Sequence, residues 1–170
     1  MLVKTYGSAV SGIDAKTITI EVDITRGIKF YLVGLPDNAV KESEQRIRAA
    51  LKNNGYRVPG KQIVINMAPA DIRKEGSAYD LPLAIGVLAA NKEFDDSKLA
   101  DFVIMGELSL DGSILPIKGA LPIAIQAKEE GFKGIFLPKE NAREAAIVND
   151  LDVFGVVNVR EVIDFFKEEI

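Results

Sequence analysis

The sequence of 170 residues contains no cysteine and no histidine. These two absences exclude cysteine-based catalysis, histidine acid–base relays and the usual ligand sets of zinc and haem sites. Carboxylates remain as metal ligands, but no D-x-D-x-D-G loop of the calcium-binding type occurs. Any chemistry must therefore come from serine, threonine, tyrosine, lysine, aspartate or glutamate. The lack of cysteine also fits a reducing compartment, so we expect a cytoplasmic protein.

Long hydrophobic runs are missing as well. A membrane-spanning helix needs about 18 or more consecutive apolar residues, and no such run is present, so we expect no membrane partner. The first ten residues are too polar and the apolar part too short for a signal peptide. Positive charge is not in excess either, because the formal net charge is −4, and this disfavours a general affinity for nucleic acid. Hydrophobic residues make up 48% of the chain, which is enough for one domain with a real core.

The clearest pattern lies in the middle of the chain. A β-branched strand over Ile63–Met67 is followed by a polar loop over Asp71–Tyr79 and then by a helix over Leu81–Ala90 that has no polar face. A helix that is apolar all round is buried or lies in a membrane, and ten residues span only about 15 Å. We therefore predict a central buried helix, with Asp80 as its N-cap, Pro82 in its first turn and the charged loop at its positive end.

The remaining pattern predicts a mixed α/β fold. Strict alternation predicts a strand over residues 16–25, and the Arg26-Gly27 turn predicts that it forms a hairpin with a strand over residues 29–33. Asp111-Gly112 predicts a second hairpin. The other expected strands cover residues 2–6, 101–110, 113–117, 134–137 and 153–156, and the other expected helices cover residues 38–52, 119–130, 141–148 and 159–169. Strands first, then alternating helices and strands, are typical of mixed α/β domains.

One segment fits most of a phosphate-binding loop. Residues 55–61 match the first seven positions of G-x-x-x-x-G-K-[ST], but Gln62 replaces the hydroxyl residue that would hold Mg²⁺. Such a loop needs a strand before it and a helix after it, so that the helix N-terminus faces the phosphates. Here a helix is expected before the segment and a strand after it. We interpret the match as a chance one and expect no ATP site in this chain.

The polar loop before the central helix holds the candidate site residues. Ser77 with Lys74 or Lys118 could form a Ser–Lys pair, a known variant of an activated nucleophile. The alternative is that Ser77 is a small polar residue that supports the start of the helix. Arg73, Lys74 and Glu75 are candidates for contact with a partner, or form an ordinary surface loop with nearly balanced charge.

Several segments together carry a family resemblance. The main segments are Met67–Ala84, Gly106–Gly112 and Leu115–Leu121. Tyr31–Asp37 and Leu137–Asn141 belong to the same pattern, and the motifs follow one another along the chain in the order expected for the family. The pattern resembles the N-terminal domain of magnesium-chelatase-like AAA+ ATPases, the competence protein ComM group, over essentially the whole chain. That domain is similar in fold to the proteolytic domain of Lon proteases, so the resemblance implies a ribosomal protein S5 domain 2-like α/β fold.

The same resemblance argues against proteolysis. Lon proteases carry the nucleophilic serine in a K-D-G-P-S-A-G segment, and matching Lys74–Asp80 to it places Ala78 at the nucleophile, with Ser77 one position earlier. The catalytic lysine of Lon matches Leu121, and Lys118 lies three positions before it. Both members of the dyad are absent from their positions, so the resemblance implies a non-catalytic domain.

Members of the family continue into an AAA+ module with Walker motifs and act as hexameric motors in DNA processing during natural transformation. The resemblance therefore implies one Lon-like domain over residues 1–170, with ATP and Mg²⁺ held by a module outside this chain. The implied partners are its own AAA+ module, neighbouring subunits of a hexamer and, through the parent protein, DNA. We expect an excised domain or a free-standing remnant. A Ser–Lys hydrolase and a stand-alone nucleic-acid-binding module remain as alternatives, the second disfavoured by the acidity of the chain.

Overall fold

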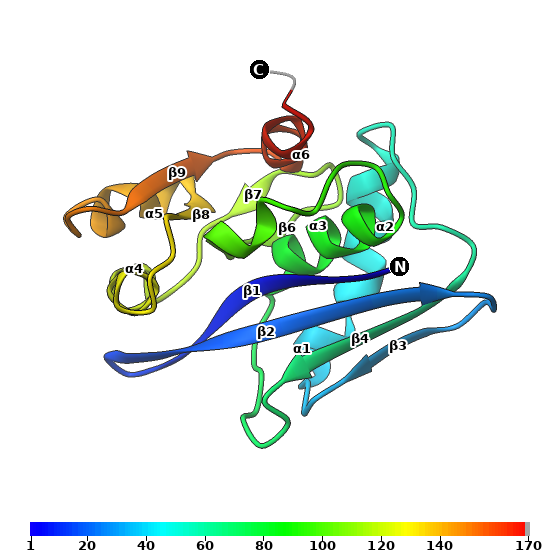
Figure 1. Ribbon diagram of the computed structural model, residues 1–170, viewed down its shortest axis with the longest axis horizontal. Coiled ribbons are helices and arrows are strands. Elements are labelled where there is room, and N and C mark those ends of the chain that lie inside the picture. Colours follow the sequence, from blue (N-terminus) through cyan, green and yellow to red (C-terminus); the bar gives the residue numbers. More distant parts are fainter. Residues whose placement is uncertain (169–170) are drawn as a thin grey trace.

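The first half of the chain forms a four-stranded sheet. In the computed structural model, which describes residues 1–168, the strand order is β1-β2-β4-β3 (Figure 1). β2 pairs antiparallel with both neighbours, whereas β3 runs parallel to β4. The strands are β1 Leu2–Ser11, β2 Asp14–Thr25, β3 Phe30–Val33 and β4 Gln62–Ala68. The fold is mixed α/β, as predicted.

The predicted hairpin between residues 16–25 and 29–33 is wrong. β2 forms its hairpin with β1, which extends to Ser11 instead of ending at Tyr6, and Gly12 takes a positive φ of 62° in the turn. β3 lies at the far edge of the sheet, beyond β4. The alternation in β2 is confirmed, because its even-numbered side chains from residue 18 to 24 are buried. Period two tells which face of a strand is buried, but it carries no information about which strand lies beside it.

The helix expected over residues 38–52 consists of two pieces. α1 covers Asn38–Lys41 and α2 covers Ser43–Lys52, with Glu42 between them. The N–H of Gln45 donates to the carbonyl of Glu42, an i to i+3 bond that tightens the chain at this point. The expected apolar stripe is confirmed, since all four of its members are buried: Val40, Ile47, Ala50 and Leu51.

α3, Asp80–Ala90, is the centre of the molecule, as predicted, and every residue in it is buried. It packs on β1 and β2, with α2 beside it and α6, Val159–Lys167, above it (Figure 1). Thr5 joins it to β1 by donating a hydrogen bond of 3.1 Å to the carbonyl of Pro82. Asp80 is not the N-cap, because it is already helical and Tyr79 occupies the cap position. The carboxylate of Asp80 has other partners, described below.

The second half of the chain adds a parallel three-stranded sheet in the order β5-β8-β9. The strand expected over residues 101–110 is broken into β5 and β6, because β5 joins this sheet whereas β6 pairs with β7 through the predicted Asp111-Gly112 hairpin. The expected end of α6 at residue 169 lies outside the described residues. The elements are η1 Leu99–Asp101, β5 Phe102–Ile104, β6 Glu107–Leu108, β7 Ile114–Leu115, α4 Ala120–Glu129, β8 Gly134–Pro138, α5 Lys139–Ala145, β9 Asp152–Val156 and α6 Val159–Lys167. Within residues 1–168, no helix is long and apolar enough to cross a membrane.

Candidate functional site

A cavity of about 590 Å³ opens beside the N-terminal end of α3. Its walls come from the end of β1, the loop that leads into α3, residues 116–118 after β7, Asp37 before α1, Met105 just before β6 and Glu107 at the start of β6. Ser77 and Lys118, two of the predicted candidates, both line it. Ala78, which matches the nucleophile position of Lon, lines it as well. Leu121 lies in α4 and is not part of the lining, and its N–H donates to Glu144 instead.

The hydroxyl of Ser77 is held by a carboxylate. Ser77, which is half-buried, donates a short hydrogen bond to Oε1 of Glu107 in β6. Sequence reasoning did not single out Glu107, although it stands in the Gly106–Gly112 segment of the family pattern. The hydroxyl proton of Ser77 is therefore engaged by an acid side chain and not by a lysine amine.

Lys74 was expected in a surface loop, and that expectation is wrong. Its side chain is 0% exposed, and its ammonium donates to the carbonyl oxygens of Gly34, at 2.6 Å, and Pro69. Desolvation lowers the pKa of Lys74, while the charge of Asp71 acts in the opposite direction. Lys74 ties three loop segments together and does not line the cavity. It is therefore not available as a partner for Ser77 or as a surface contact.

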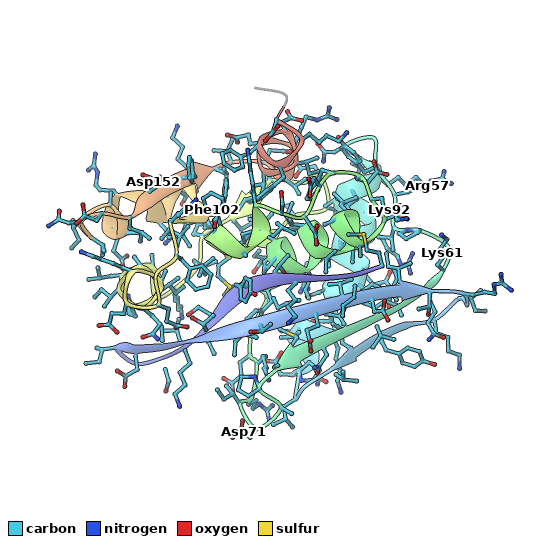
Figure 2. The ribbon with its side chains drawn as sticks, viewed as in Figure 1. Arg57, Lys61, Asp71, Lys92, Phe102 and Asp152 are labelled. Carbon is cyan, nitrogen blue, oxygen red and sulfur yellow. The ribbon has the colours of Figure 1, made fainter. Side chains whose placement is uncertain are left out.

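The other two members of the predicted contact group are exposed. Arg73 and Glu75 form an ion pair of 3.2 Å at the surface. An exposed pair of this kind stabilises a fold little, by about 0–1 kcal/mol, so these side chains remain free to reorient. Figure 2 shows Asp71 at the outer tip of this loop, where the chain turns back towards α3. The exposed part of the predicted contact group therefore lies on the rim of the site.

Asp37 positions the loop and was missed by sequence reasoning. Its Oδ1 accepts from the N–H of Val40 at 2.8 Å and so caps α1, while its Oδ2 accepts from the N–H of Gly76 at 3.0 Å. Its own N–H donates to the carbonyl of Lys74 at 2.9 Å. The cap was readable from an aspartate directly before a helix. The bond to Gly76 was not, because the two residues are far apart in the sequence.

Asp80 forms a buried network below the cavity. Its carboxylate accepts from Arg46 at 2.6 and 3.0 Å, from the hydroxyl of Ser43 at 2.6 Å and from the N–H of Leu108 at 3.0 Å. Burial raises the pKa of Asp80, and these donors act against that rise. The hydrogen bond to Asp80 raises the pKa of Arg46. Because the network joins α2, α3 and β6, it fixes the position of Glu107 opposite Ser77.

The acidic side chains and the segment over residues 55–61 are the remaining features that the sequence raised as candidates for metal or phosphate binding. Within residues 1–168, no group of three or more acidic side chains comes together as metal ligands would. The segment over residues 55–61 follows α2 and precedes β4, so the predicted order of helix, loop and strand is confirmed. Figure 2 shows Arg57 and Lys61 at a different edge of the molecule from Asp71. No helix begins directly after this segment, so no helix N-terminus is placed there to meet a phosphate.

Comparison with known proteins identifies the family. The model of the family described as subunit ChlI of Mg-chelatase matches residues 20–141, more than half of the chain. The chain belongs to this family. Among relatives of this ChlI-type chain, competence protein ComM of Haemophilus influenzae is 40% identical over 163 residues, which is 95% of this chain and 32% of that protein. YifB of Escherichia coli is 43% identical over 142 residues, 83% of this chain and 28% of that protein.

Lon proteases are more distant relatives of the ChlI-type chain. Lon protease 2 of Bacillus subtilis is 30% identical over 128 residues, which is 73% of this chain and 22% of that protein. By comparison, the chain spans about a third of the length of ComM and YifB, the more similar relatives described above. Ala78, which the motif resemblance matches to the nucleophile position of Lon, is among the residues that line the cavity.

Proposed function

We propose that this chain is a non-catalytic accessory and assembly domain of a magnesium-chelatase-like AAA+ ATPase. The observation that carries the proposal is the state of Ser77, whose hydroxyl is bound to the carboxylate of Glu107. A Ser–Lys dyad needs the amine within about 2.6–3.2 Å of the hydroxyl, so that it can take the proton. A carboxylate is a far weaker base than a lysine amine, and Ala78 offers only a methyl group at the matched position.

The family relationship supports a proposal for the wider role of the chain. Competence protein ComM of Haemophilus influenzae is about three times as long as the region that this chain matches, and we assign the AAA+ module, with its ATP and Mg²⁺, to the part of the parent protein outside this chain. The domain described here supplies contacts to that module and to neighbouring subunits of a hexamer. The relative from Haemophilus influenzae is named a competence protein, and we propose that the parent protein of this chain acts in DNA processing in the cytoplasm. In this proposal DNA is contacted through the assembly, since this chain has a net charge of −4.

A second candidate, a Ser–Lys hydrolase, is supported by one observation. Ser77 and Lys118 line the same cavity, although they are far apart in the sequence. For this activity Ser77 would have to exchange its bond with Glu107 for one with the amine of Lys118. The two functions therefore differ in the partner of a single hydroxyl group.

Covalent labelling separates the two functions. The protein is incubated with a serine-directed fluorophosphonate and, separately, with an unfolded protein substrate, and both reactions are followed by intact-mass analysis. We expect no adduct and no cleavage, in parallel with an active serine peptidase as positive control. Stoichiometric labelling at Ser77, lost in Lys118→Ala but kept in the exposed-lysine control Lys128→Ala, would establish the hydrolase instead.

A calorimetric titration with Mg-ATP tests the assignment of ATP to the module outside this chain. We expect no heat of binding at millimolar nucleotide. Saturable binding that Lys61→Ala abolishes would show that residues 55–61 form a nucleotide site after all.

A further inference from the structure

β1 is an edge strand, and its outer edge is free at one end. Ser11 and Asp14 are paired across a two-residue turn, so odd-numbered residues of β1 exchange hydrogen bonds with β2. Even-numbered residues must then point their N–H and C=O groups away from the sheet. Ser8 agrees with this parity, because its N–H donates to the sulfur of Met105 at 3.4 Å. The register continues without a bulge to Val10, whose backbone groups therefore also face outward.

The outward edge at Val10 lies in a groove. Val10 lines the cavity of about 590 Å³ described above and also a second cavity of about 440 Å³. Glu75 and Tyr79 line both cavities as well, so the two cavities adjoin each other at the end of β1, and together they are called the groove below. Outside β2, no backbone partner is found for Val10 among residues 1–168. A strand edge with unpaired N–H and C=O groups is a template for pairing with another extended chain.

The larger cavity carries an excess of negative charge. Of the described residues that line it, Asp37, Glu75 and Glu107 carry carboxylates and Lys118 carries an ammonium. Oε1 of Glu107 receives the hydroxyl of Ser77, but its other oxygen accepts no hydrogen bond within residues 1–168. An unpaired carboxylate oxygen in a partly enclosed space favours a cationic donor, since such charge-assisted bonds are about twice as strong as neutral ones.

We propose that this groove binds an extended segment of a partner protein that carries a lysine or arginine. The main chain of the segment pairs with the free edge of β1 at Val10, and its basic side chain enters the larger cavity toward Glu107. Main-chain pairing of this type supplies affinity, whereas the pocket for the side chain supplies specificity. The inference rests on the proposed function, because a cavity without catalytic groups keeps a bound segment intact and so serves assembly.

Fluorescence anisotropy with defined peptides tests the pairing and the charge separately. The probe is a labelled Ser-Thr-Val-Lys-Val-Thr-Ser peptide, compared with the same peptide carrying Glu in place of Lys. Val10→Pro removes the outward N–H, and a proline is tolerated at an edge position of this kind. Leu2→Pro is the matched control, because it removes an outward N–H at the far end of the same strand. Glu107→Gln is matched by Glu129→Gln, an exposed residue of α4.

We expect the Lys peptide to bind, with affinity about tenfold weaker in Val10→Pro and in Glu107→Gln and unchanged within about twofold in the two controls. The Glu peptide and a Lys peptide with N-methylated valines should bind at least tenfold more weakly to the unmodified protein. If Val10→Pro does not fold, the N-methylated peptide alone tests whether the main chain of the segment pairs with β1. Equal binding of the Lys, Glu and N-methylated peptides would overturn the proposal. So would a dimer, seen by size-exclusion chromatography, that Val10→Pro dissociates, because the groove would then be filled by a second copy.

Failure of this inference is distinguishable from failure of the proposed function. No peptide binding together with no fluorophosphonate adduct contradicts the groove proposal and leaves the non-catalytic assembly domain standing. Peptide binding followed by hydrolysis that Ser77→Ala abolishes supports the groove and overturns the non-catalytic role. Peptide binding without hydrolysis and without an adduct supports both.

Discussion

α3 and the loop that precedes it are neighbours in the chain and are stabilised in different ways. All residues of α3 are buried and almost all are apolar, so the helix is held by packing contacts from every side. The loop over residues 71–79 is mostly exposed at its outer part, yet it contains the buried ammonium of Lys74 and a backbone held by Asp37. Packing is spread over many contacts, whereas the loop depends on a few directed hydrogen bonds. The cavity is therefore sensitive to single polar groups, and the core is sensitive to volume.

The largest expected effect concerns the border between the two regions. Asp80→Ala removes the acceptor of a buried ion pair and leaves Arg46, Ser43 and the N–H of Leu108 without it. Breaking a buried pair from one side typically costs about 3–5 kcal/mol. We expect a loss of this size in the free energy of unfolding measured by urea denaturation. Glu44→Ala, which breaks the partly exposed Glu44–Arg48 pair within α2, is the control and should change the free energy of unfolding by less than about 1 kcal/mol.

A core truncation tests the packing side of the comparison. Leu88 is fully buried in α3, and Leu88→Ala should lower the free energy of unfolding by about 2–5 kcal/mol, the usual range for a core leucine. Binding of the Lys peptide should survive, because the cavity is lined by other residues. A denaturant melt within error of the unmodified protein would mean that this helix is not held by packing.

The third prediction concerns the close approach of α3 to β2 at Gly86. A Cβ atom on Gly86 would lie 2.8 Å from Cγ2 of Val22, and Thr5 is nearby at 3.5 Å. Gly86→Leu improves helix propensity by up to about 1 kcal/mol, but overpacking of a filled core typically costs about 1–3 kcal/mol and sometimes more. We expect a net loss of stability in thermal unfolding. A melting temperature equal to or above that of the unmodified protein would show that the space at Gly86 can open at little cost.

The sequence was sufficient to predict which faces of a helix or a strand are buried. The absence of polar residues in Leu81–Ala90 predicted the burial of α3, and the alternation in β2 predicted its buried side. It was not sufficient for contacts between distant segments. The neighbour of β2 was assigned wrongly, because a parallel strand and a hairpin strand of the same composition have the same alternation. The burial of Lys74 depends on carbonyl groups of Gly34 and Pro69, which no local pattern connects to a lysine.

The candidate site shows the same limit. Ser77 and Lys118 were proposed as partners, and the structure places them in one cavity, but the residue that holds the hydroxyl of Ser77 is Glu107. Ala78, which the resemblance to Lon proteases matches to the nucleophile position, lines the same cavity. The hydrogen bond itself follows from how β6 is fixed by Asp80, and this is a property of the tertiary structure.

The smallest expected effect is a pH dependence that belongs to the loop and not to the core. Desolvation lowers the pKa of Lys74 in the folded protein below its ordinary value of 10.5. Between the folded and the unfolded pKa the unfolded chain therefore binds more protons than the folded chain, so stability rises with pH in the window just below 10.5. A neutral amine keeps two N–H donors, one for each of the two carbonyl oxygens, so the loop need not open as the proton leaves.

The measurement is the free energy of unfolding of the unmodified protein minus that of Lys74→Met, from pH 7 to pH 10. Taking the difference cancels the alkaline titration of all other groups. We expect this difference to increase with pH, with a slope below about 1.4 kcal/mol per unit. A difference that decreases with pH would mean that the buried ammonium is stabilised by its carbonyl partners more than burial penalises it.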